Sequence, residues 1–352
     1  MSPGDQPLTG VRIVDLSLML PGPWATLMLA QLGASVVHVE PPGGDGLRSA
    51  MPSAYASVNR GKEVVELDLK SEEGRTRLRE LLAAADVVVE GFRPGTAARL
   101  GFGPDELRAQ NDRLIYCSLS GYGSSGPYAG HPGHDVNYLA VVGLLSISGE
   151  PAGPPQAGGG VPVADLAASL FATQAILAAL LLRDRAGSGS TIDVPIAAAA
   201  LKLLEPRLAE YDGAGAPSKG ELMARAAYGT FRCRDGRWMA VGCIEDHFWR
   251  RLCTAVGRPD LVDDPRFGSY TSRCRYADEI NAALGEAFLQ RDRGEWVDLL
   301  LAADVPVSPV HEISEIEEDP QVRQWGLIER VGAVRAVGLP YTGLRRPGLV
   351  AL

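Results

Sequence analysis

The stretch Val11-Arg-Ile-Val-Asp-Leu16 (VRIVDL) and the residues that follow it, up to Val39, decide the fold. The stretch itself predicts a β-strand, and residues 23–32 (PWATLMLAQL) follow with apolar side chains at helical spacing. Gly33 is placed to end this helix, and Ser35 to Val39 (SVVHV) predicts a second strand. Because strand and helix alternate across short connections, the pattern indicates parallel strands joined by helical crossovers.

The same alternation continues along the chain. Ser71 is placed to cap a helix that runs to about Ala85, and acidic residues occupy the first turn of that helix. Residues 86–90 (DVVVE) and 114–120 (LIYCSLS) predict two further strands. The predicted fold class is therefore α/β, with a large doubly wound parallel sheet of the Rossmann type. Ligands of such sheets bind beyond the carboxyl ends of the strands, so binding groups are expected directly after each strand.

A different pattern begins near Tyr228 and predicts a second, smaller α+β domain. Two alternating segments, 228–233 and 238–242, flank Asp235-Gly236, which is a strong hairpin signal. Helical stretches follow at about 247–256, 276–289 and 294–302. We therefore expect a large domain with linker helices (1–212), a small domain (213–304) and a C-terminal segment that returns to the large domain (305–352). Within that segment, residues 305–310 (VPVSPV) predict a strand.

Composition limits what this chain can do. Its 352 residues exceed what one hydrophobic core usually supports, and its formal charge of −9 argues against a nucleic-acid or membrane-surface binder. The five cysteines form no CxxC pair, which favours reduced thiols in a cytoplasmic protein over disulfides or a metal site. The apolar run from Leu166 to Leu182 is interrupted by polar residues and is short for a membrane span, so it predicts a buried helix.

Two residues are candidates for acid–base or nucleophilic catalysis. His134 lies in Gly133-His-Asp-Val-Asn-Tyr138, just after a strand and a glycine-rich loop, although a lone histidine is more often structural. Asp165 lies where an apolar segment turns into the predicted buried helix. There it can cap the helix, act as a base whose pKa is raised by burial, or do both. Asp135 is interpreted as fixing the loop through backbone hydrogen bonds.

Two further groups of residues suggest binding functions. Gly121 to Gly126 matches GxGxxG, but Pro127 follows at once where a dinucleotide site needs a helix, which favours a simple turn of the chain. Basic side chains suited to phosphate follow the predicted strands. They are Arg60, Lys62, Lys70, Arg93 and Arg99.

Together, several motifs resemble the family III coenzyme A transferases, the CaiB/BaiF type, and within them the α-methylacyl-CoA racemases. The motifs occur in the family's order over almost the whole chain. They include Leu20-Pro-Gly-Pro, Val39-Glu-Pro-Pro-Gly-Gly-Asp45, Asn59-Arg-Gly-Lys62, Leu67-Asp-Leu-Lys70, Glu90-Gly-Phe-Arg-Pro-Gly95 and Gly121-Tyr-Gly123. The pattern Gly133 to Tyr138 is similar to the racemase form, whereas transferases more often carry an aromatic residue at position 134. The segment Tyr228 to Glu245 is similar to the racemase small domain.

The resemblance implies epimerisation of 2-methylacyl-CoA thioesters through an enolate. His134 and Asp165 would be the opposing acid and base, and Glu245 would support His134. The alternative that it leaves open is a CoA transferase, in which Asp165 forms an acyl anhydride. No metal or separate cofactor is implied, because coenzyme A arrives as part of the substrate. The residues expected to contact CoA or substrate are Leu67, Asp68, Leu69, Lys70, Arg93, Arg99, Gly133, Asp135, Asn137 and Tyr138.

The resemblance also implies an interlocked homodimer, in which each active site combines the large domain of one chain with the small domain of its partner. The sequence departs from the racemases at three places. Glu40-Pro41 replaces an arginine-proline pair, Leu166-Ala-Ala-Ser169 replaces a glycine-rich run, and Met223 to Ala227 replaces a glycine-glycine-x-proline segment.

Overall fold

The computed structural model describes residues 6–341. The chain divides into two compact units, which we call the large unit and the small unit. The large unit comprises the residues up to Ser146, Gln156–Pro206 and the residues from Gln321 onward, and the small unit comprises Ile147–Pro155 and Arg207–Pro320. Residues 305–320 thus group with the small unit, and only the residues after them group with the large unit.

The large unit is built on a six-stranded sheet in the order β3-β2-β1-β4-β5-β6, in which every neighbouring pair is parallel. This confirms the predicted doubly wound α/β fold, and the strand order is that of the Rossmann type. The strands are β1 (Arg12–Leu16), β2 (Ser35–Glu40), β3 (Glu63–Glu66), β4 (Val87–Glu90), β5 (Ile115–Ser120) and β6 (Thr191–Pro195).

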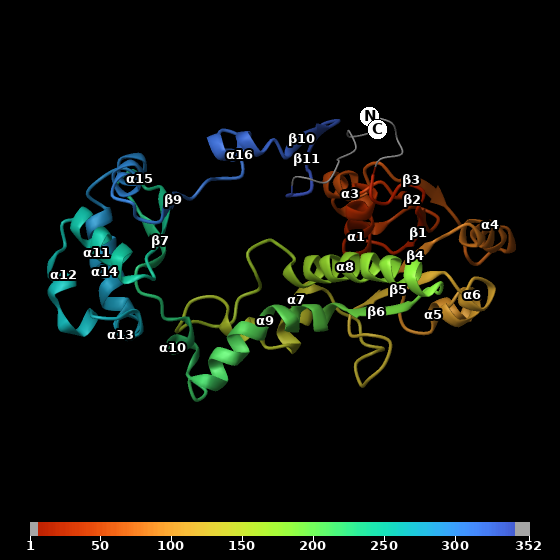
Figure 1. Ribbon diagram of the computed structural model, residues 1–352, viewed down its shortest axis with the longest axis horizontal. Helices are drawn as coiled ribbons and strands as arrows, with labels where there is room; N and C mark the ends of the chain where they lie inside the picture. Colours follow the sequence, from red (N-terminus) through yellow and green to blue (C-terminus); the bar gives the residue numbers. More distant parts are fainter. Residues whose placement is uncertain (1–5, 342–352) are drawn as a thin grey trace. The chain divides into compact units, whose positions relative to one another are not determined.

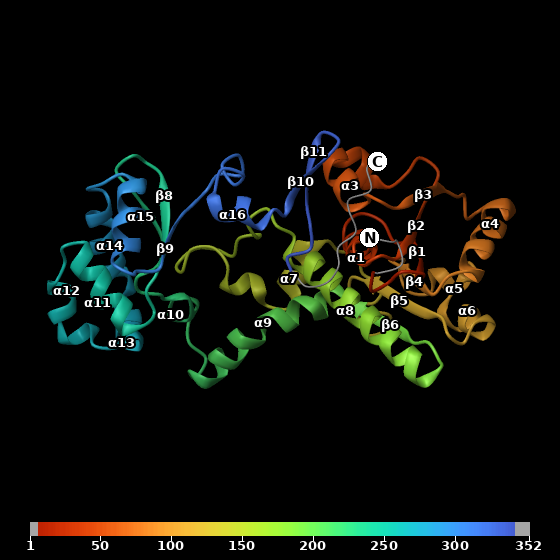
Figure 2. The same cartoon turned by 45° about the horizontal axis from the view of Figure 1, so that its top comes forward.

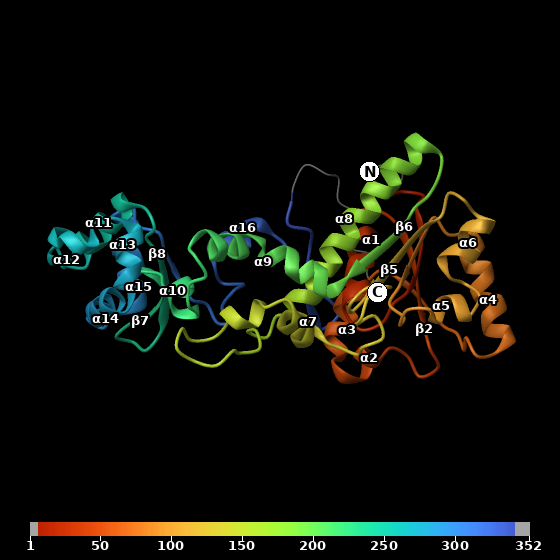
Figure 3. The ribbon, with the colours of Figure 1, turned by 90° about the horizontal axis from the view of Figure 1, so that it is seen from below.

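Alternate residues of the central strands enter two different cores, one on each face of the sheet. Val87 and Val89 lie in the core with α1 (Pro21–Ala30) and α8 (Val163–Ala186), whereas Val88 lies in the core with α4 (Glu72–Ala83) and α6 (Pro104–Gln110). Figure 3 shows these helices on opposite sides of the sheet, with α5 (Thr96–Arg99) beside α4 and α6. Burial on both faces explains why the central strands are continuous apolar runs.

Helix ends follow from local chemistry. The Ser71 hydroxyl accepts a hydrogen bond from the Gly74 N–H at 3.0 Å, which confirms the predicted cap of α4. Helix α8 is the one helix, among residues 6–341, that is long and apolar enough to cross a membrane by length and composition. Its buried residues, such as Ala168, Ala172 and Ile176, pack in the core with α1, whereas Leu181 and Leu182 are exposed. The sequence therefore predicted the burial of α8 correctly for one face of the helix only.

The remaining elements of the large unit surround the sheet. The hairpin β10 (Ile328–Val331) and β11 (Val334–Val337) lies beside α3 (Pro52–Val58), as Figure 2 shows, and the Arg60 guanidinium donates to the Val337 carbonyl at 2.8 Å. The other helices are α2 (Gly46–Ala50), α7 (Asp135–Val141), the first part of α9 (Ile196–Gly213) and α16 (Pro320–Trp325), with a short 3-10 helix at Leu144–Ile147.

The small unit has its own core between a three-stranded sheet and several helices (Figure 1). Strands β7 (Tyr228–Arg232) and β8 (Trp238–Gly242) form the predicted hairpin, and Gly236 takes a positive φ of 78° in its turn. Strand β9 (Val307–Pro309) pairs with β8 of the small unit, so the expectation that this strand returns to the large domain is wrong. The helices are α10 (Lys219–Met223), α11 (Asp246–Ala255), α12 (Asp260–Asp263), α13 (Tyr270–Arg275), α14 (Ala277–Phe288) and α15 (Arg293–Ala302), with a 3-10 turn at Pro265–Phe267.

Candidate active site

The carboxyl ends of β1 and β4 lie side by side at the centre of the sheet, where Leu16 is in register with Glu90. The chain leaves β1 toward α1 on one face and leaves β4 toward α5 on the other, so the connections diverge at this point. Such a switch point opens a crevice above the strand ends, and ligands of this fold class bind there. Two cavities of the large unit lie at this edge of the sheet, and Leu18 and Phe92 line both of them.

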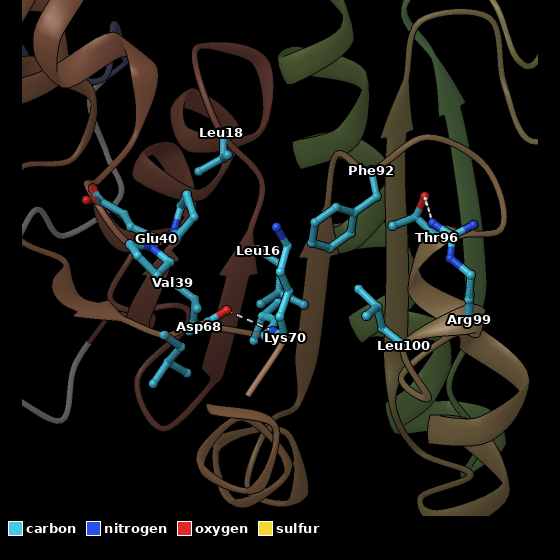
Figure 4. A pocket seen from close by; sticks show the side chains of 14 residues that line it. Leu16, Leu18, Val39, Glu40, Asp68, Lys70, Phe92, Thr96, Arg99 and Leu100 are labelled. Carbon is cyan, nitrogen blue, oxygen red and sulfur yellow. Dashed lines mark hydrogen bonds between the residues drawn. The ribbon is translucent and has the colours of Figure 1, made fainter. Parts of the chain in front are cut away.

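The first cavity, which we call the strand-end cleft, has a volume of about 650 Å³. Figure 4 shows Asp68 and Lys70 on one side of this cleft and Phe92, Thr96 and Arg99 on the other. Its wall is mostly apolar, with two cations at the margin, which suits a long ligand that carries both apolar and anionic groups. The lining residues are Leu16, Leu18, Val39, Glu40, Pro41, Pro42, Leu67, Asp68, Leu69, Lys70, Phe92, Thr96, Arg99 and Leu100.

Five of the residues predicted to contact CoA therefore line one cleft: Leu67, Asp68, Leu69, Lys70 and Arg99. The Asp68 carboxylate accepts from the Lys70 N–H at 2.9 Å, which fixes the turn that carries Lys70. Arg99 is on α5, where its guanidinium lies 3.4 Å from the Thr96 hydroxyl. Both basic side chains are exposed, so they remain accessible to phosphate groups.

Arg60 and Lys62, by contrast, are not available as phosphate ligands. Both are buried, and the Lys62 ammonium lies 3.2 Å from the Asp15 carboxylate and 2.8 Å from the Pro23 carbonyl. The sequence interpretation of these two residues is therefore wrong. Their cationic groups hold the β1–α1 junction and the β10–β11 hairpin in place.

The second cavity, which we call the Asp165 cavity, has a volume of about 800 Å³. It lies between the segment after β1, the segment after β4, and the first turns of α7 and α8. Six of the predicted active-site residues line it together with Asp165 itself. They are Arg93, Gly133, His134, Asp135, Asn137 and Tyr138.

Asp165 is the third residue of α8, and the position before that helix is occupied by Pro162. Asp165 is therefore not the cap of α8, which was one of its two predicted functions. Within residues 6–341, no hydrogen bond reaches its half-buried carboxylate. Burial, with a further contribution from the Asp135 carboxylate, raises the pKa of Asp165 to about 7. A carboxylate in this state can serve as a base or a nucleophile near neutral pH.

His134 is the residue immediately before α7, and its side chain is exposed on the wall of the Asp165 cavity. The Asn137 side-chain oxygen accepts from the His134 N–H at 3.0 Å, so Asn137 fixes the backbone at His134. The Tyr138 hydroxyl donates to the Gly133 carbonyl at 2.6 Å, and its ring is buried. Asn137 and Tyr138 thus shape the loop that presents His134.

The glycine-rich loop before His134 is packed tightly against an aromatic cluster. The Tyr122 ring lies 5.2 Å from the Tyr138 ring, centroid to centroid. A Cβ atom at Gly121 or at Gly133 would come within 2.7 Å of the Tyr138 ring, so both positions require glycine. No helix opens at Gly126, since the next helix begins at Asp135; this agrees with a loop that turns the chain.

Glu245 lies in the small unit, at the residue before α11, and its exposed carboxylate makes no cap hydrogen bond to that helix. The buried Arg273 guanidinium holds both neighbours of Glu245, because it bonds the Ile244 carbonyl at 3.0 Å and the Asp246 carboxylate at 2.9 Å. The turn at Glu245 is therefore rigidly supported from within the small unit, while its carboxylate is left unused there.

The segment after β1 also lines the site, although none of its residues was among the predicted site residues. Ser17, Leu18, Met19, Leu20, Pro21 and Gly22 all line the Asp165 cavity. Met19 takes a positive φ of 66°, which is unusual for a residue other than glycine. Its N–H donates to the Asp45 carboxylate at 2.8 Å, and the Ser169 hydroxyl donates to the Pro21 carbonyl at 2.6 Å. The sequence signal that could have identified residues 17–22 was their position directly after the first strand of a doubly wound sheet.

These features define an α/β protein with a half-buried carboxylate of raised pKa at the switch point of its sheet, next to a long cleft with a cationic margin. A profile described as CoA-transferase family III matches residues 8–348. The chain therefore belongs to CoA-transferase family III, and the family predicted from its motifs is confirmed.

Curated relatives and solved structures agree with this assignment. The acetyl-CoA:oxalate CoA-transferase of Acetobacter aceti is 37% identical in an alignment of 344 positions that covers 95% of this chain and 88% of the relative. The succinate–glutarate CoA-transferase of Agrobacterium fabrum is 35% identical in an alignment of 361 positions, gaps included, that covers 97% of this chain and 88% of the relative. A CaiB/BaiF family protein from Brucella suis has a similar structure, with a TM-score of 0.86, 32% identity and coverage of 98% of this chain and 97% of that one.

The racemase subfamily suggested by the sequence is not confirmed by these relatives, because both curated relatives are named as CoA-transferases.

Proposed function

We propose that this protein transfers coenzyme A from an acyl-CoA thioester to a free carboxylic acid, with Asp165 as the nucleophile. The observation that carries the proposal is the Asp165 carboxylate, half-buried in the Asp165 cavity, with its pKa raised to about 7. Near neutral pH a large fraction of such a group is ionised, while its low solvation keeps it more nucleophilic than an exposed carboxylate. The names of the relatives support the same chemistry.

In this proposal the two cavities bind different parts of the acyl-CoA substrate. The strand-end cleft accepts the CoA moiety, with Lys70 and Arg99 next to its phosphate groups. The thioester then passes Leu18 and Phe92, which line both cavities, and reaches Asp165. Coenzyme A enters only as part of the substrate, and no separate cofactor or metal takes part.

The reaction proceeds through covalent intermediates on Asp165. The Asp165 carboxylate attacks the thioester carbonyl carbon and expels CoA thiolate, which leaves an aspartyl–acyl anhydride. The thiolate attacks the Asp165 carbonyl, so the donor acid departs as a carboxylate and an aspartyl–CoA thioester remains. The acceptor carboxylate attacks this thioester and again expels the thiolate. Attack of the thiolate on the acceptor carbonyl gives the new acyl-CoA and restores the Asp165 carboxylate.

A second candidate function is epimerisation of a 2-methylacyl-CoA. One observation favours it: His134 and Asp165 line the same cavity, as two bases on opposite faces of an α-carbon would have to do. In this alternative His134 and Asp165 exchange the α-proton with the substrate. Glu245 of a partner chain would support His134 in an interlocked homodimer.

A pair of assays on three proteins separates the two functions. The wild type, Asp165→Ala and His134→Ala are incubated with an acyl-CoA and a free dicarboxylic acid, and separately with a 2-methylacyl-CoA in heavy water. The transferase proposal expects new acyl-CoA from the wild type, none from Asp165→Ala, and near-normal transfer from His134→Ala. The racemase function would replace this proposal if the wild type incorporated deuterium at the α-carbon, both variants failed to do so, and no CoA were transferred to any acid.

A further inference from the structure

Asp135 is the first residue of α7, but its side chain serves the start of α8. One carboxylate oxygen, Oδ1, accepts from the Ala164 N–H at 2.7 Å and from the Asp165 N–H at 3.3 Å. The first N–H groups of a helix have no partner within that helix. Pro162, at the capping position of α8, offers no side-chain acceptor. Asp135 thus caps α8 from a neighbouring helix, at the turn that carries Asp165.

This contact fixes the two helices to each other at the wall of the Asp165 cavity. Helices α7 and α8 pack together, and Asp135 and Asp165 line the same cavity. The Asp135 carboxylate is therefore a second negative charge beside the Asp165 carboxylate. The other titratable or charged groups that line this cavity are Arg93, His131, His134 and Tyr138. The segment after β1, from Ser17 to Gly22, adds no carboxylate or amine.

We propose that Asp135 is a positioning residue for the nucleophile: it holds the first turn of α8 and places a fixed negative charge next to Asp165. This inference rests on the proposed function. It gives Asp135 a role beyond the substrate contact expected from the sequence. The charge of Asp135 opposes ionisation of Asp165, and the hydrogen bonds of Asp135 occupy the N–H groups that would otherwise favour it. The nucleophile therefore keeps a proton affinity that an exposed aspartate lacks.

Two substitutions separate the charge from the hydrogen bonds. Asp135→Asn keeps an acceptor oxygen for the Ala164 and Asp165 N–H groups but removes the charge. Asp135→Ala removes both. The measurement is the pH profile of kcat/KM for the acyl-CoA. For Asp135→Asn we expect the acid limb to move toward acid by about half a pH unit or more. For Asp135→Ala we expect the rate to fall by about tenfold or more across the pH range, because the helix start is no longer held.

Asp193→Asn is the matched control. The Asp193 carboxylate accepts from the Ser124 N–H at 2.8 Å, so this variant also exchanges a hydrogen-bonded carboxylate for an amide, but Asp193 does not line the Asp165 cavity. Its acid limb should coincide with that of the wild type. An unchanged limb in Asp135→Asn, or an equal shift in Asp193→Asn, would overturn the inference.

A titration that needs no activity gives a second test. The Asp165 carboxyl carbon is followed by carbon-13 NMR and assigned by its disappearance in Asp165→Asn. Its midpoint should be lower in Asp135→Asn than in the wild type, and equal midpoints would refute the role of Asp135. Loss of CoA transfer in Asp165→Ala tests the proposed function separately. If that variant stays active, the proposed function fails, whatever the Asp135 variants do.

Discussion

At the scale of single residues, the burial that raises the pKa of Asp165 has a cost in stability at alkaline pH. Burial raises the pKa of Asp165 to about 7 in the folded chain, above an ordinary value of 3.8. The folded state thus holds the proton more tightly than the unfolded state does. The contribution of the Asp165 carboxyl group to stability is present in full below pH 3.8, and it is lost as the pH rises through about 7.

Asp165→Asn should therefore be more stable than the wild type in alkaline solution, because the amide has no charge to bury. We expect a difference in the free energy of unfolding on the order of 1–3 kcal/mol at about pH 8, closing toward about pH 4. Urea unfolding at the two pH values measures it. A difference that is the same at both pH values would show that the charge of Asp165 is not its source.

A second prediction at this scale concerns the glycine loop. Gly121→Ala places a Cβ atom 2.7 Å from the Tyr138 ring and hydroxyl, so the ring must move away from the wall of the Asp165 cavity. We expect a loss of about 1–3 kcal/mol in unfolding free energy, together with reduced activity. Gly130→Ala is the control, since its Cβ atom meets nothing within 4 Å. Equal behaviour of the two variants in thermal unfolding would contradict this account of the loop.

The sequence predicted several of these residues but not their contacts. His134 and Asp165 stood out because each is a chemically capable group at a segment boundary, and the structure places both on one cavity. Capping by Asp135 could not be predicted in detail, because it depends on how α7 and α8 approach each other. Lys62 was misassigned for a related reason. The polar segment Asn59-Arg-Gly-Lys62 suggests an exposed loop, and only the structure shows that Lys62 pairs with the buried Asp15.

At the scale of elements, a buried ion pair between Asp15 and Lys62 holds the start of the segment after β1. Burial alone would raise the pKa of Asp15, but Lys62 and His38 hold it below its usual range. Burial lowers the pKa of Lys62 to about 8. The Asp15 carboxylate also accepts from the Ser17 N–H at 3.0 Å and from the Thr26 hydroxyl at 2.6 Å. This cluster therefore connects β1, the following turn and α1.

Lys62→Met should be strongly destabilising, because it leaves the Asp15 carboxylate buried without its cation. We expect a loss of about 3–5 kcal/mol in unfolding free energy. The double variant Asp15→Asn/Lys62→Met should recover much of that loss, since no unpaired charge remains. Urea unfolding of the two single variants and the double variant measures the coupling energy between Asp15 and Lys62. Strictly additive losses in unfolding free energy would contradict a stabilising ion pair.

The elements that the sequence missed share a physical cause. Strands β3 and β6 lie at the two edges of the sheet, so they lack the continuous apolar run that marks the central strands. The sequence Glu63-Val-Val-Glu66 gives only a weak strand signal, and Thr191 to Pro195 ends in proline. Strand β9 was recognised as a strand, but its partner could not be, because pairing with β8 spans a long stretch of sequence.

At the scale of the whole molecule, the interlocked homodimer that the family resemblance implies stays a prediction, and exposed leucines form a surface that a partner chain would cover. Apolar side chains on α8 and α9 remain uncovered in the single chain, including Leu181, Leu182, Leu201 and Leu208. Sedimentation equilibrium should give a mass of twice the 37.3 kDa of one chain. A mass of one chain at every concentration would contradict the dimer and any active site shared between subunits.

The most direct test of the account follows atoms through Asp165. An acceptor acid whose carboxylate carries heavy oxygen is turned over with an acyl-CoA, and the peptide containing Asp165 is then analysed by mass spectrometry. In the proposed reaction the bridging oxygen of the second anhydride comes from the acceptor and stays with Asp165 when the thiolate releases the product. We predict heavy oxygen in the Asp165 carboxylate. Turnover that leaves this carboxylate unlabelled would contradict the claim that Asp165 is the nucleophile.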